Sequence, residues 1–187
     1  MVVNKEAIEL IKRYEGLRLV PYKDPVGIVT IGYGHSGWKG GSITLQKAEE
    51  LLMEDIAKAQ IQVDKYQKKY GFNSNQYGAL VSFAFNIGNI DQLTAKGTRS
   101  IKDIEKYLPA YCKAGGKTLP GLVSRRKAEL ELFKKAAPSA AAPSEEEKKP
   151  ISTIIDRVIA GEFGNGEARK NNLYNYIQKL VNQRLKG

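Results

Sequence analysis

The chain has 187 residues, of which 42% are hydrophobic and 27% charged, and its formal net charge is +10. This length and apolar content allow one ordinary domain with a real core and a small second domain. The basic balance favours a polyanionic partner, but Lys and Arg are scattered among acidic residues without a zinc-finger or RNP-like pattern, which argues against a nucleic-acid-binding protein.

The first predicted element is a short helix that Gly16 can end in a left-handed conformation. Its apolar residues have helical spacing: Ala7, Ile8, Leu10 and Ile11. Charged residues interrupt the first 16 positions, so this segment predicts neither a signal peptide nor a membrane span, and we expect no stable membrane insertion. The single cysteine, Cys112, leaves no intramolecular disulfide and fits synthesis in a reducing cytoplasm.

Residues 17–43 are predicted to form short antiparallel strands, because Val, Ile, Thr and Tyr alternate there with eight Gly and Pro residues. This is the only β region that we expect. Thr44 can cap a long helix that runs to about Tyr70 and bridges two lobes, and residues 74–87 are apolar nearly all round, as in a central buried helix. Ser100 and Pro120 mark the starts of two more helices. The expected fold class is α+β and mainly helical, with a cleft between hairpin and helices.

Glu15, Asp24 and Thr30 are the candidate catalytic residues. Hydrolysis of a glycosidic bond needs one protonated carboxyl for the leaving oxygen and one ionised group that activates water or stabilises the cationic sugar. Apolar neighbours favour the protonated form of Glu15, whereas the polar turn around Asp24 favours its ionised form. The hydroxyl of Thr30, on the return strand, can help Asp24 to hold the water molecule.

The surroundings of these residues resemble a known family. The stretch YEGLRLVPYKDPVGIVTIGYGH at 14–35 is similar to the catalytic hairpin of the phage-type lysozymes, the muramidase endolysins of tailed bacteriophages. NSNQYGALVSFAFNIGN at 73–89 resembles their core helix and GGKTLPGLVSRRKAELELF at 115–133 their last catalytic-domain helix, so the likeness covers about residues 4–135.

This resemblance implies a two-lobed lysozyme-like domain without cofactor or metal. It also implies hydrolysis of the β-1,4 bond between N-acetylmuramic acid and N-acetylglucosamine in peptidoglycan, for lysis of the host cell. Glu15 would be the general acid, Asp24 the catalytic carboxylate and Thr30 the residue that positions water. The enzyme would be made in the host cytoplasm and reach the wall after release through a separate pore. The family favours inversion at the anomeric carbon, although sequence spacing does not give the carboxyl separation on which this outcome depends.

Three further residues have competing interpretations. Arg125 resembles the family position that pairs with the acid glutamate, but the adjacent Arg126 could fill it. An arginine there favours the ionised form of Glu15, so the balance against its apolar neighbours stays open. Asn86 is a candidate for binding a sugar acetamido group, or else a capping or turn residue. His35, the only histidine, is expected to be a hydrogen-bonded structural residue.

Composition predicts a boundary after the catalytic domain. We expect a catalytic domain at 1–136, a linker rich in Ala, Pro, Ser and charge at 137–150, and a small module at 151–187. The basic excess lies mostly in the first part: residues 1–136 hold 22 basic and 14 acidic residues (+8), and 137–187 hold 8 and 6 (+2). The module is short enough for its core to be marginal, so we expect a small helical bundle that can depend on self-association.

The segment 152–182 resembles the cell-wall-binding repeat of the Cpl-seven type. The specific part is VIAGEFGNGEARKNNL, in which we expect the wall-binding residues Gly164, Asn165, Gly166 and Arg169. Glycines permit a tight turn, and an amide with a guanidinium can meet the acetamido and carboxylate groups of a muropeptide. Phe163 replaces a common tryptophan, about three residues are missing before Tyr174, and only one repeat is present. Such repeats imply a peptidoglycan partner from a Gram-positive host.

Two other functions remain open at the level of sequence. A lytic transglycosylase would use Glu15 without a water-holding Asp24 and Thr30, and would release an anhydro sugar in place of a reducing end. A basic wall-binding or membrane-perturbing protein would kill without enzymatic activity, and would still lyse cells after Glu15→Gln.

Overall fold

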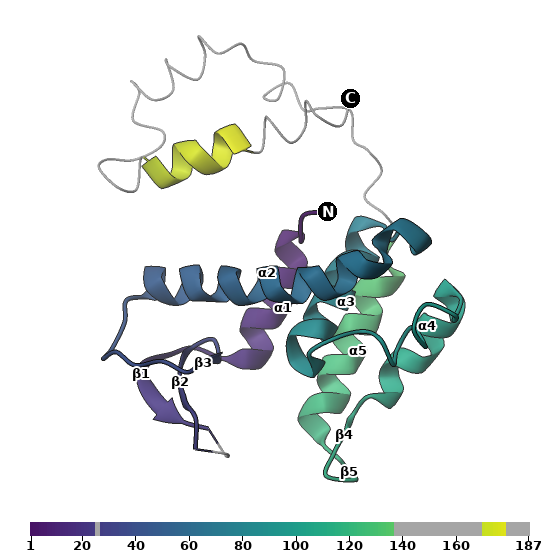
Figure 1. Cartoon of the computed structure of the whole chain (residues 1–187), viewed down its shortest axis with the longest axis horizontal. Helices are drawn as coiled ribbons and strands as arrows, with labels where there is room; N and C mark the ends of the chain where they lie inside the picture. Colours follow the sequence, from purple (N-terminus) through teal and green to yellow (C-terminus); the bar gives the residue numbers. More distant parts are fainter. Residues whose placement is uncertain (25–26, 137–169, 179–187) are drawn as a thin grey trace. The chain divides into compact units, whose positions relative to one another are not determined.

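The computed structural model describes residues 1–24, 27–136 and 170–178. The chain divides into two compact units, Met1–Ala137 and Pro138–Gly187. The first unit, drawn in Figure 1, contains α1 (Lys5–Glu15), β1 (Arg18–Lys23), β2 (Val29–Gly32), β3 (His35–Ser36), α2 (Leu45–Tyr70), α3 (Ser74–Ile87), α4 (Ile101–Tyr107), the 3-10 turn η1 (Leu108–Ala110), β4 (Lys113–Ala114), β5 (Lys117–Thr118) and α5 (Pro120–Lys134). The prediction of a mainly helical α+β fold is confirmed. In the second unit residues 170–178 are helical, and the rest of the expected bundle lies outside the described residues.

Helix α1 begins and ends at residues that suit helix ends. The side chain of Asn4 accepts a hydrogen bond from the amide of Ala7, and Gly16 follows the last turn with a φ of 69°. Asn4 also donates to the carbonyl of Ser74 at 3.2 Å, which ties α1 to α3. A Cβ atom on Gly78 would lie only 2.8 Å from the Cβ of Ala7, so this glycine permits the close approach of the two helices.

The hairpin region forms one antiparallel sheet in the order β1-β2-β3. Thr30 on β2 faces Tyr22 on β1 and Ser36 on β3. The expectation of a single β region is wrong, because β4 and β5 pair as a second small hairpin. Its turn is Gly115–Gly116, with φ values of 56° and 77°, and both favour glycine. Strands of two residues are too short to show alternation, so only this turn could have indicated them.

Helix α2 joins the two lobes of the first unit. The side chain of Thr44 accepts a hydrogen bond from the amide of Lys47, which fixes the predicted start, and Gly71 ends the helix in the left-handed conformation. One end of α2 contacts β2 and β3, and the helix also contacts α3. Figure 1 shows it crossing from the sheet to the helical lobe. The prediction of a long bridging helix is thus confirmed.

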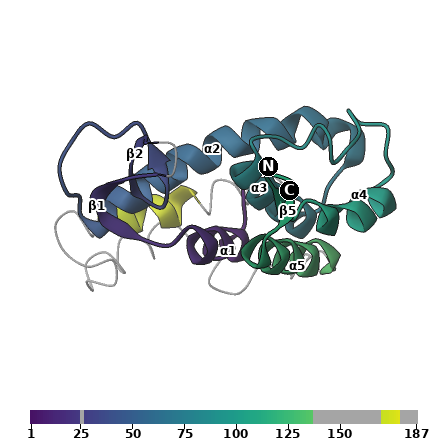
Figure 2. The same cartoon turned by 90° about the horizontal axis from the view of Figure 1, so that it is seen from below.

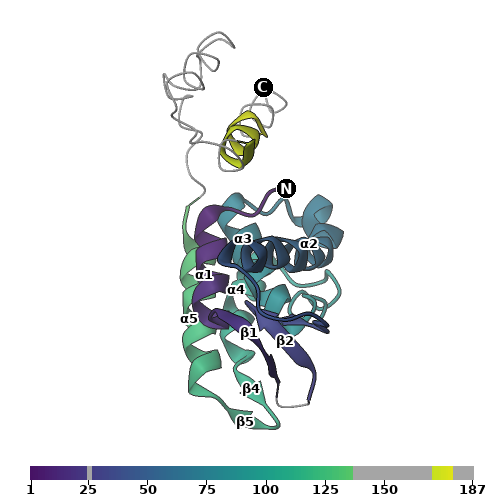
Figure 3. The same cartoon turned by 90° about the vertical axis from the view of Figure 1, so that its left-hand side faces the viewer.

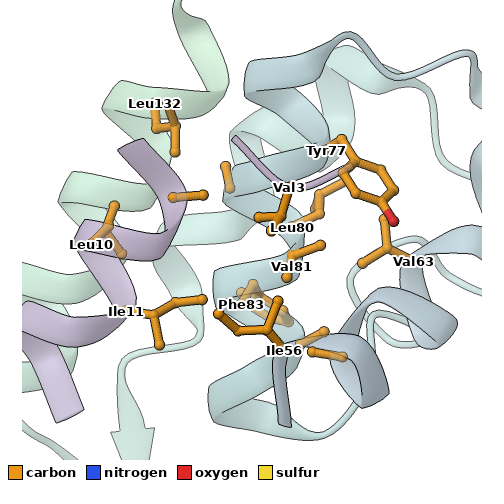
Figure 4. Packing of buried hydrophobic residues seen from close by; sticks show 14 of the residues in the cluster. Val3, Leu10, Ile11, Ile56, Val63, Tyr77, Leu80, Val81, Phe83 and Leu132 are labelled. Atoms are coloured by element: carbon orange, nitrogen blue, oxygen red, sulfur yellow. The ribbon is translucent and has the colours of Figure 1, made fainter. Parts of the chain in front are cut away.

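Helix α3 is the centre of the hydrophobic core. Asn73 and Gln76 form a capping box at its start, and every residue from 77 to 84 is buried. Figure 4 shows Phe83 and Val81 of α3 packed between Ile11 of α1 and Ile56 of α2. Helices α1, α2 and α5 all contact α3. The prediction of a buried central helix is confirmed.

The last two helices of the first unit, α4 and α5, start where the sequence predicts. Ser100 caps α4 through a capping box with Asp103, and Pro120 occupies the first turn of α5. Helix α5 packs against both α3 and α1, and Figure 3 shows α1 and α5 side by side. Among the described residues, no helix combines the length and the apolar character that a membrane crossing requires.

Candidate active site

Glu15 ends α1 at the junction of the two lobes. In Figure 2 this helix lies between the β1–β2 hairpin and α5. The Glu15 side chain is 21% exposed, so water and ligands can reach it. Gly34, which precedes β3, approaches it closely: a Cβ atom on Gly34 would lie 3.6 Å from Oε2 of Glu15. Its φ of 91° is a second reason for glycine at this place.

Arg125 of α5 holds Glu15 from the helical side. Of the two candidate arginines it is Arg125 that reaches the acid, with Nη1 donating to Oε1 of Glu15 at 2.6 Å. Its Nε donates to Glu129 at 3.1 Å and its Nη2 to the carbonyl of Ser82 at 3.2 Å. The Arg125 side chain is 4% exposed and its guanidinium lies 5.7 Å from the ring of Tyr14. All three nitrogen atoms of the Arg125 guanidinium thus donate hydrogen bonds to protein groups.

Arg126 has a different position. Its Nη2 donates to Oε1 of Glu129 and to Oδ1 of Asn86, both at 3.0 Å, and its guanidinium lies 4.6 Å from the ring of Phe83. Its Nε is 2.8 Å from Oε2 of Glu129, but neither atom makes a hydrogen bond, so this contact is an ion pair with poor alignment. Burial lowers the pKa of Arg126, and the charge of Glu129 opposes this shift.

The hairpin places Asp24 and Thr30. Asp24 starts a tight turn in which its Oδ1 accepts a hydrogen bond from the amide of Ile28 at 2.8 Å and its own amide donates to the carbonyl of Ile28. Thr30 is buried on β2, and its hydroxyl donates to the same carbonyl at 3.2 Å. The hydroxyl oxygen of Thr30 therefore keeps lone pairs that can accept a hydrogen bond from water. Both residues are held by short-range contacts within the hairpin.

Asn86 and His35 each have a side-chain partner that bears on their competing interpretations. The capping interpretation of Asn86 is wrong, because Gly88 ends α3 and the Asn86 oxygen accepts from Arg126. The exposed Asn86 side chain still carries an amide nitrogen that can donate to a ligand. Nδ1 of His35 lies 2.8 Å from Oδ2 of Asp55, which agrees with a structural hydrogen-bonded histidine.

A cavity of ≈310 Å³ opens beside this site. Its lining includes Gly34 before β3, Ser36 of β3, Asp55 and Gln62 of α2, and Phe85 of α3. Gly34, which lines this cavity, is also the residue that approaches Glu15, so the acid lies close to the cavity without lining it. The walls combine an aromatic ring with carboxylate, amide and hydroxyl groups, which suits a ligand with both apolar faces and hydroxyls, such as a sugar.

Sequence reasoning missed Glu129 and Ser82. Glu129 is fully buried and Ser82 donates to its Oε1 at 2.8 Å. Burial raises the pKa of the Glu129 carboxyl, while Arg126 and Arg125 oppose that shift. One signal was present: Glu129 follows Arg125 and Arg126 by four and three residues, so the three side chains share one face of a helix. Nothing in the sequence indicated that this face is buried.

A partly exposed carboxyl held by arginine, a cavity lined by the Gly34 that approaches this carboxyl, and a second carboxylate on the adjoining hairpin fit one class: a lysozyme-like glycoside hydrolase. The phage lysozyme family model matches residues 12–129. The chain belongs to the phage lysozyme family, and its substrate is bacterial peptidoglycan.

Individual relatives agree with this assignment. The endolysin of Lactococcus phage c2 is 41% identical over 174 residues, which cover 90% of this chain and 75% of the relative. The endolysin of Acyrthosiphon pisum secondary endosymbiont phage 1 is 39% identical, over 73% of this chain and all of the relative. Among solved structures, the muramidase domain of SpmX from Asticcacaulis excentricus is similar with a TM-score of 0.64 and 28% identity, over 72% of this chain and 99% of that one.

The tail matches a family model of its own. Residues 152–185 match the CW_7 repeat, which accords with the resemblance to a cell-wall-binding repeat. The predicted wall-binding residues, Gly164, Asn165, Gly166 and Arg169, lie outside the described residues, and so does Phe163. In the described helix 170–178, Tyr174 and Ile177 are exposed.

Proposed function

We propose that this enzyme hydrolyses the β-1,4 bond between N-acetylmuramic acid and N-acetylglucosamine with Glu15 as general acid. The observation that carries the proposal is the position of Glu15: it is partly exposed, it is bonded to Arg125 at 2.6 Å, and it shares Gly34 with the cavity. A carboxyl that is anchored by an arginine on one side and accessible to a ligand on the other can deliver a proton to a bound glycosidic oxygen.

Asp24 and Thr30 supply the second half of the mechanism. The Asp24 carboxylate activates the attacking water, or stabilises the positive charge that develops on the sugar ring. Thr30 donates its proton to the carbonyl of Ile28, so its oxygen can accept a hydrogen bond from that water. Both residues stand on one hairpin, which lets a single backbone element orient the nucleophile.

The acid role requires a proton on Glu15 while the glycan is bound. Arg125 holds one oxygen of this carboxyl through their hydrogen bond at 2.6 Å. A bound sugar chain that excludes water from the exposed side of Glu15 would let the proton pass to the glycosidic oxygen and not to solvent.

The tail would keep the enzyme on its substrate. We assign a catalytic domain to 1–136, a linker to 137–150 and a wall-binding module to 151–187, with Gly164, Asn165, Gly166 and Arg169 as contacts to muropeptides. One repeat offers one weak site, so avidity would come from the active-site cleft or from self-association of the module. We further propose a Gram-positive host, synthesis in its cytoplasm and later passage to the wall.

The test compares the intact chain with Glu15→Gln on purified Gram-positive peptidoglycan, and it measures turbidity and released reducing sugar. This change keeps the shape and removes the acid, so we expect a fall in rate of about 100-fold to 10,000-fold. Melting curves show whether the variant is folded. Equal clearance by both proteins would overturn the proposal and favour a non-enzymatic basic wall-binding protein.

Product analysis separates hydrolysis from transglycosylation. Hydrolysis leaves a reducing end, which mass spectrometry reads as one added water, whereas transglycosylation leaves an anhydro sugar. Asp24→Asn gives a second criterion, because a transglycosylase needs no residue that holds water. Anhydro products with unchanged activity of Asp24→Asn would replace the hydrolase mechanism with the transglycosylase mechanism.

A further inference from the structure

Behind the pair of Glu15 and Arg125 lies a carboxylate that does not line the described cavity beside Glu15. Glu129 of α5 is fully buried. Its Oε1 accepts hydrogen bonds from Ser82 Oγ at 2.8 Å, Arg125 Nε at 3.1 Å and Arg126 Nη2 at 3.0 Å. Three donors on a single buried oxygen leave this carboxylate little freedom to move.

The contacts of Glu129 decide where Arg125 points. Arg125 is a long side chain with many rotamers, and most of that freedom must be removed for its guanidinium to hold one place. Glu129 takes its Nε and the Ser82 carbonyl takes its Nη2, which leaves Nη1 directed at Glu15. Glu129 therefore acts on Glu15 indirectly, through the planar guanidinium of Arg125, whose donors have a fixed geometry.

We propose that Glu129 is a positioning residue for the reaction, which sets the place of the Glu15 carboxyl by fixing Arg125. The proposal rests on the proposed role of Glu15 as the acid. A displacement of about 1 Å in a catalytic group can lower a rate about 100-fold, so a residue that never touches the substrate can control kcat.

A structural role predicts something different. Two adjacent arginines are buried beside Glu129, and a carboxylate is needed there to balance their charge whatever the chemistry of Glu15. In that case removal of Glu129 would lower stability, and any fall in kcat would not depend on Arg125. A double-mutant cycle between Glu129 and Arg125, measured on kcat, separates the two roles.

The cycle uses the full chain with Glu129→Gln, Arg125→Ala and both changes together, assayed for reducing ends well below each melting temperature. We expect Glu129→Gln to lower kcat about 100-fold while KM stays within about twofold. The lost contact between Glu129 and Arg125 affects the position of the acid and not the affinity for the substrate. In the Arg125→Ala background the same change should lower kcat less than about threefold. An equal fall in both backgrounds would overturn the proposal.

Leu132→Ala is the matched control for stability. Leu132 is a buried core residue of the same helix outside the arginine cluster, so its loss lowers the melting temperature without moving Arg125. Its kcat should equal that of the wild type at low temperature. A fall in kcat as large as that of Glu129→Gln would mean that lost stability explains both variants and would overturn the positioning role.

Ser82→Ala tests the same contact without a change in charge. It removes one of the three donors to Oε1 of Glu129, and it replaces Glu129→Gln in the cycle if that variant does not fold. We expect a fall in kcat of about tenfold that is absent in the Arg125→Ala background. Full kcat for Ser82→Ala, or a fall that persists without Arg125, would contradict the proposal. A wild-type protein that releases no reducing ends would instead overturn the hydrolysis on which the proposal rests.

Discussion

The two walls of the active site are built in different ways. The hairpin wall is local: Asp24 and Thr30 are both held through Ile28, within the seven residues 24–30, and apolar side chains of the same hairpin, such as Val20, remain exposed. The helical wall depends on distant contacts, since Arg125 reaches Glu15 across 110 positions of sequence and its other neighbours Ser82, Arg126 and Glu129 are buried.

The two walls therefore differ in how far the position of a catalytic group depends on the packing of the core. Backbone hydrogen bonds within a turn can orient a carboxylate without a core around it. An arginine that must point at one oxygen needs a packed and polar environment that satisfies its other donors. We therefore expect changes around Arg125 to affect both folding and activity, and loss of the Asp24 carboxylate in the hairpin to affect activity alone.

The largest expected effect is on stability in the helical lobe. Phe83 is buried in α3, where Arg126 lies over its ring and Tyr111 meets it edge to face with ring centroids 5.1 Å apart. Phe83→Ala should lower the free energy of unfolding by about 3–5 kcal/mol. Val20→Ala, at a 64% exposed hairpin position, should change it by less than about 0.5 kcal/mol. Urea unfolding of both variants measures the contrast, and similar losses would contradict it.

A second prediction concerns activity without stability. Asp24→Asn keeps an oxygen that can accept from the amide of Ile28, so the turn should survive, while the carboxylate is lost. We expect kcat on peptidoglycan to fall about 100-fold with a melting temperature close to that of the wild type. A strong fall in the melting temperature would show that the stability of the hairpin depends on the charge of Asp24, and would contradict the contrast between the two walls.

Two glycines of the hairpin region form a matched pair. Gly34 and Gly37 have φ values of 91° and 79°, so alanine at either position should lower stability by about 1 kcal/mol. Only at Gly34 would the new methyl group contact Glu15 and enter the cavity, while the space at Gly37 is open. We expect Gly34→Ala to lower kcat/KM about tenfold and Gly37→Ala to leave it unchanged. Equal activities of the two variants would show that glycine is needed at position 34 only for its backbone conformation.

The smallest effect is a pH dependence of stability. Burial raises the pKa of Tyr77, between α2 and α3, from 10.0 to about 12. The unfolded tyrosine ionises near its ordinary pKa and the folded one does not, so this contribution is complete below pH 10 and is lost as the pH rises toward 12. The urea midpoint of Tyr77→Phe should therefore fall less between pH 9 and 11 than that of the wild type. If the urea midpoints of the two proteins fall equally, groups other than Tyr77 cause the loss of stability at alkaline pH.

Much of the fold follows from local sequence signals. Thr44, Ser100 and Gly16 bound three helices as predicted, because capping depends on side chains within a few residues of the helix end. The long bridging helix and the buried α3 follow from their apolar periodicity. The β4–β5 hairpin was missed because its strands are too short for any period, and only the Gly115–Gly116 turn indicates it.

The candidate site is divided in the same way. Residue types and the family resemblance were enough to select Glu15, Asp24 and Thr30, since a motif that runs from the end of α1 through one hairpin is visible as contiguous sequence. Tertiary structure alone decided that Arg125 and not Arg126 reaches Glu15, and that Glu129 lies at the centre of the arginine cluster. These assignments depend on how α1, α3 and α5 meet, and the burial that arises there determines which of several similar charges must find a partner.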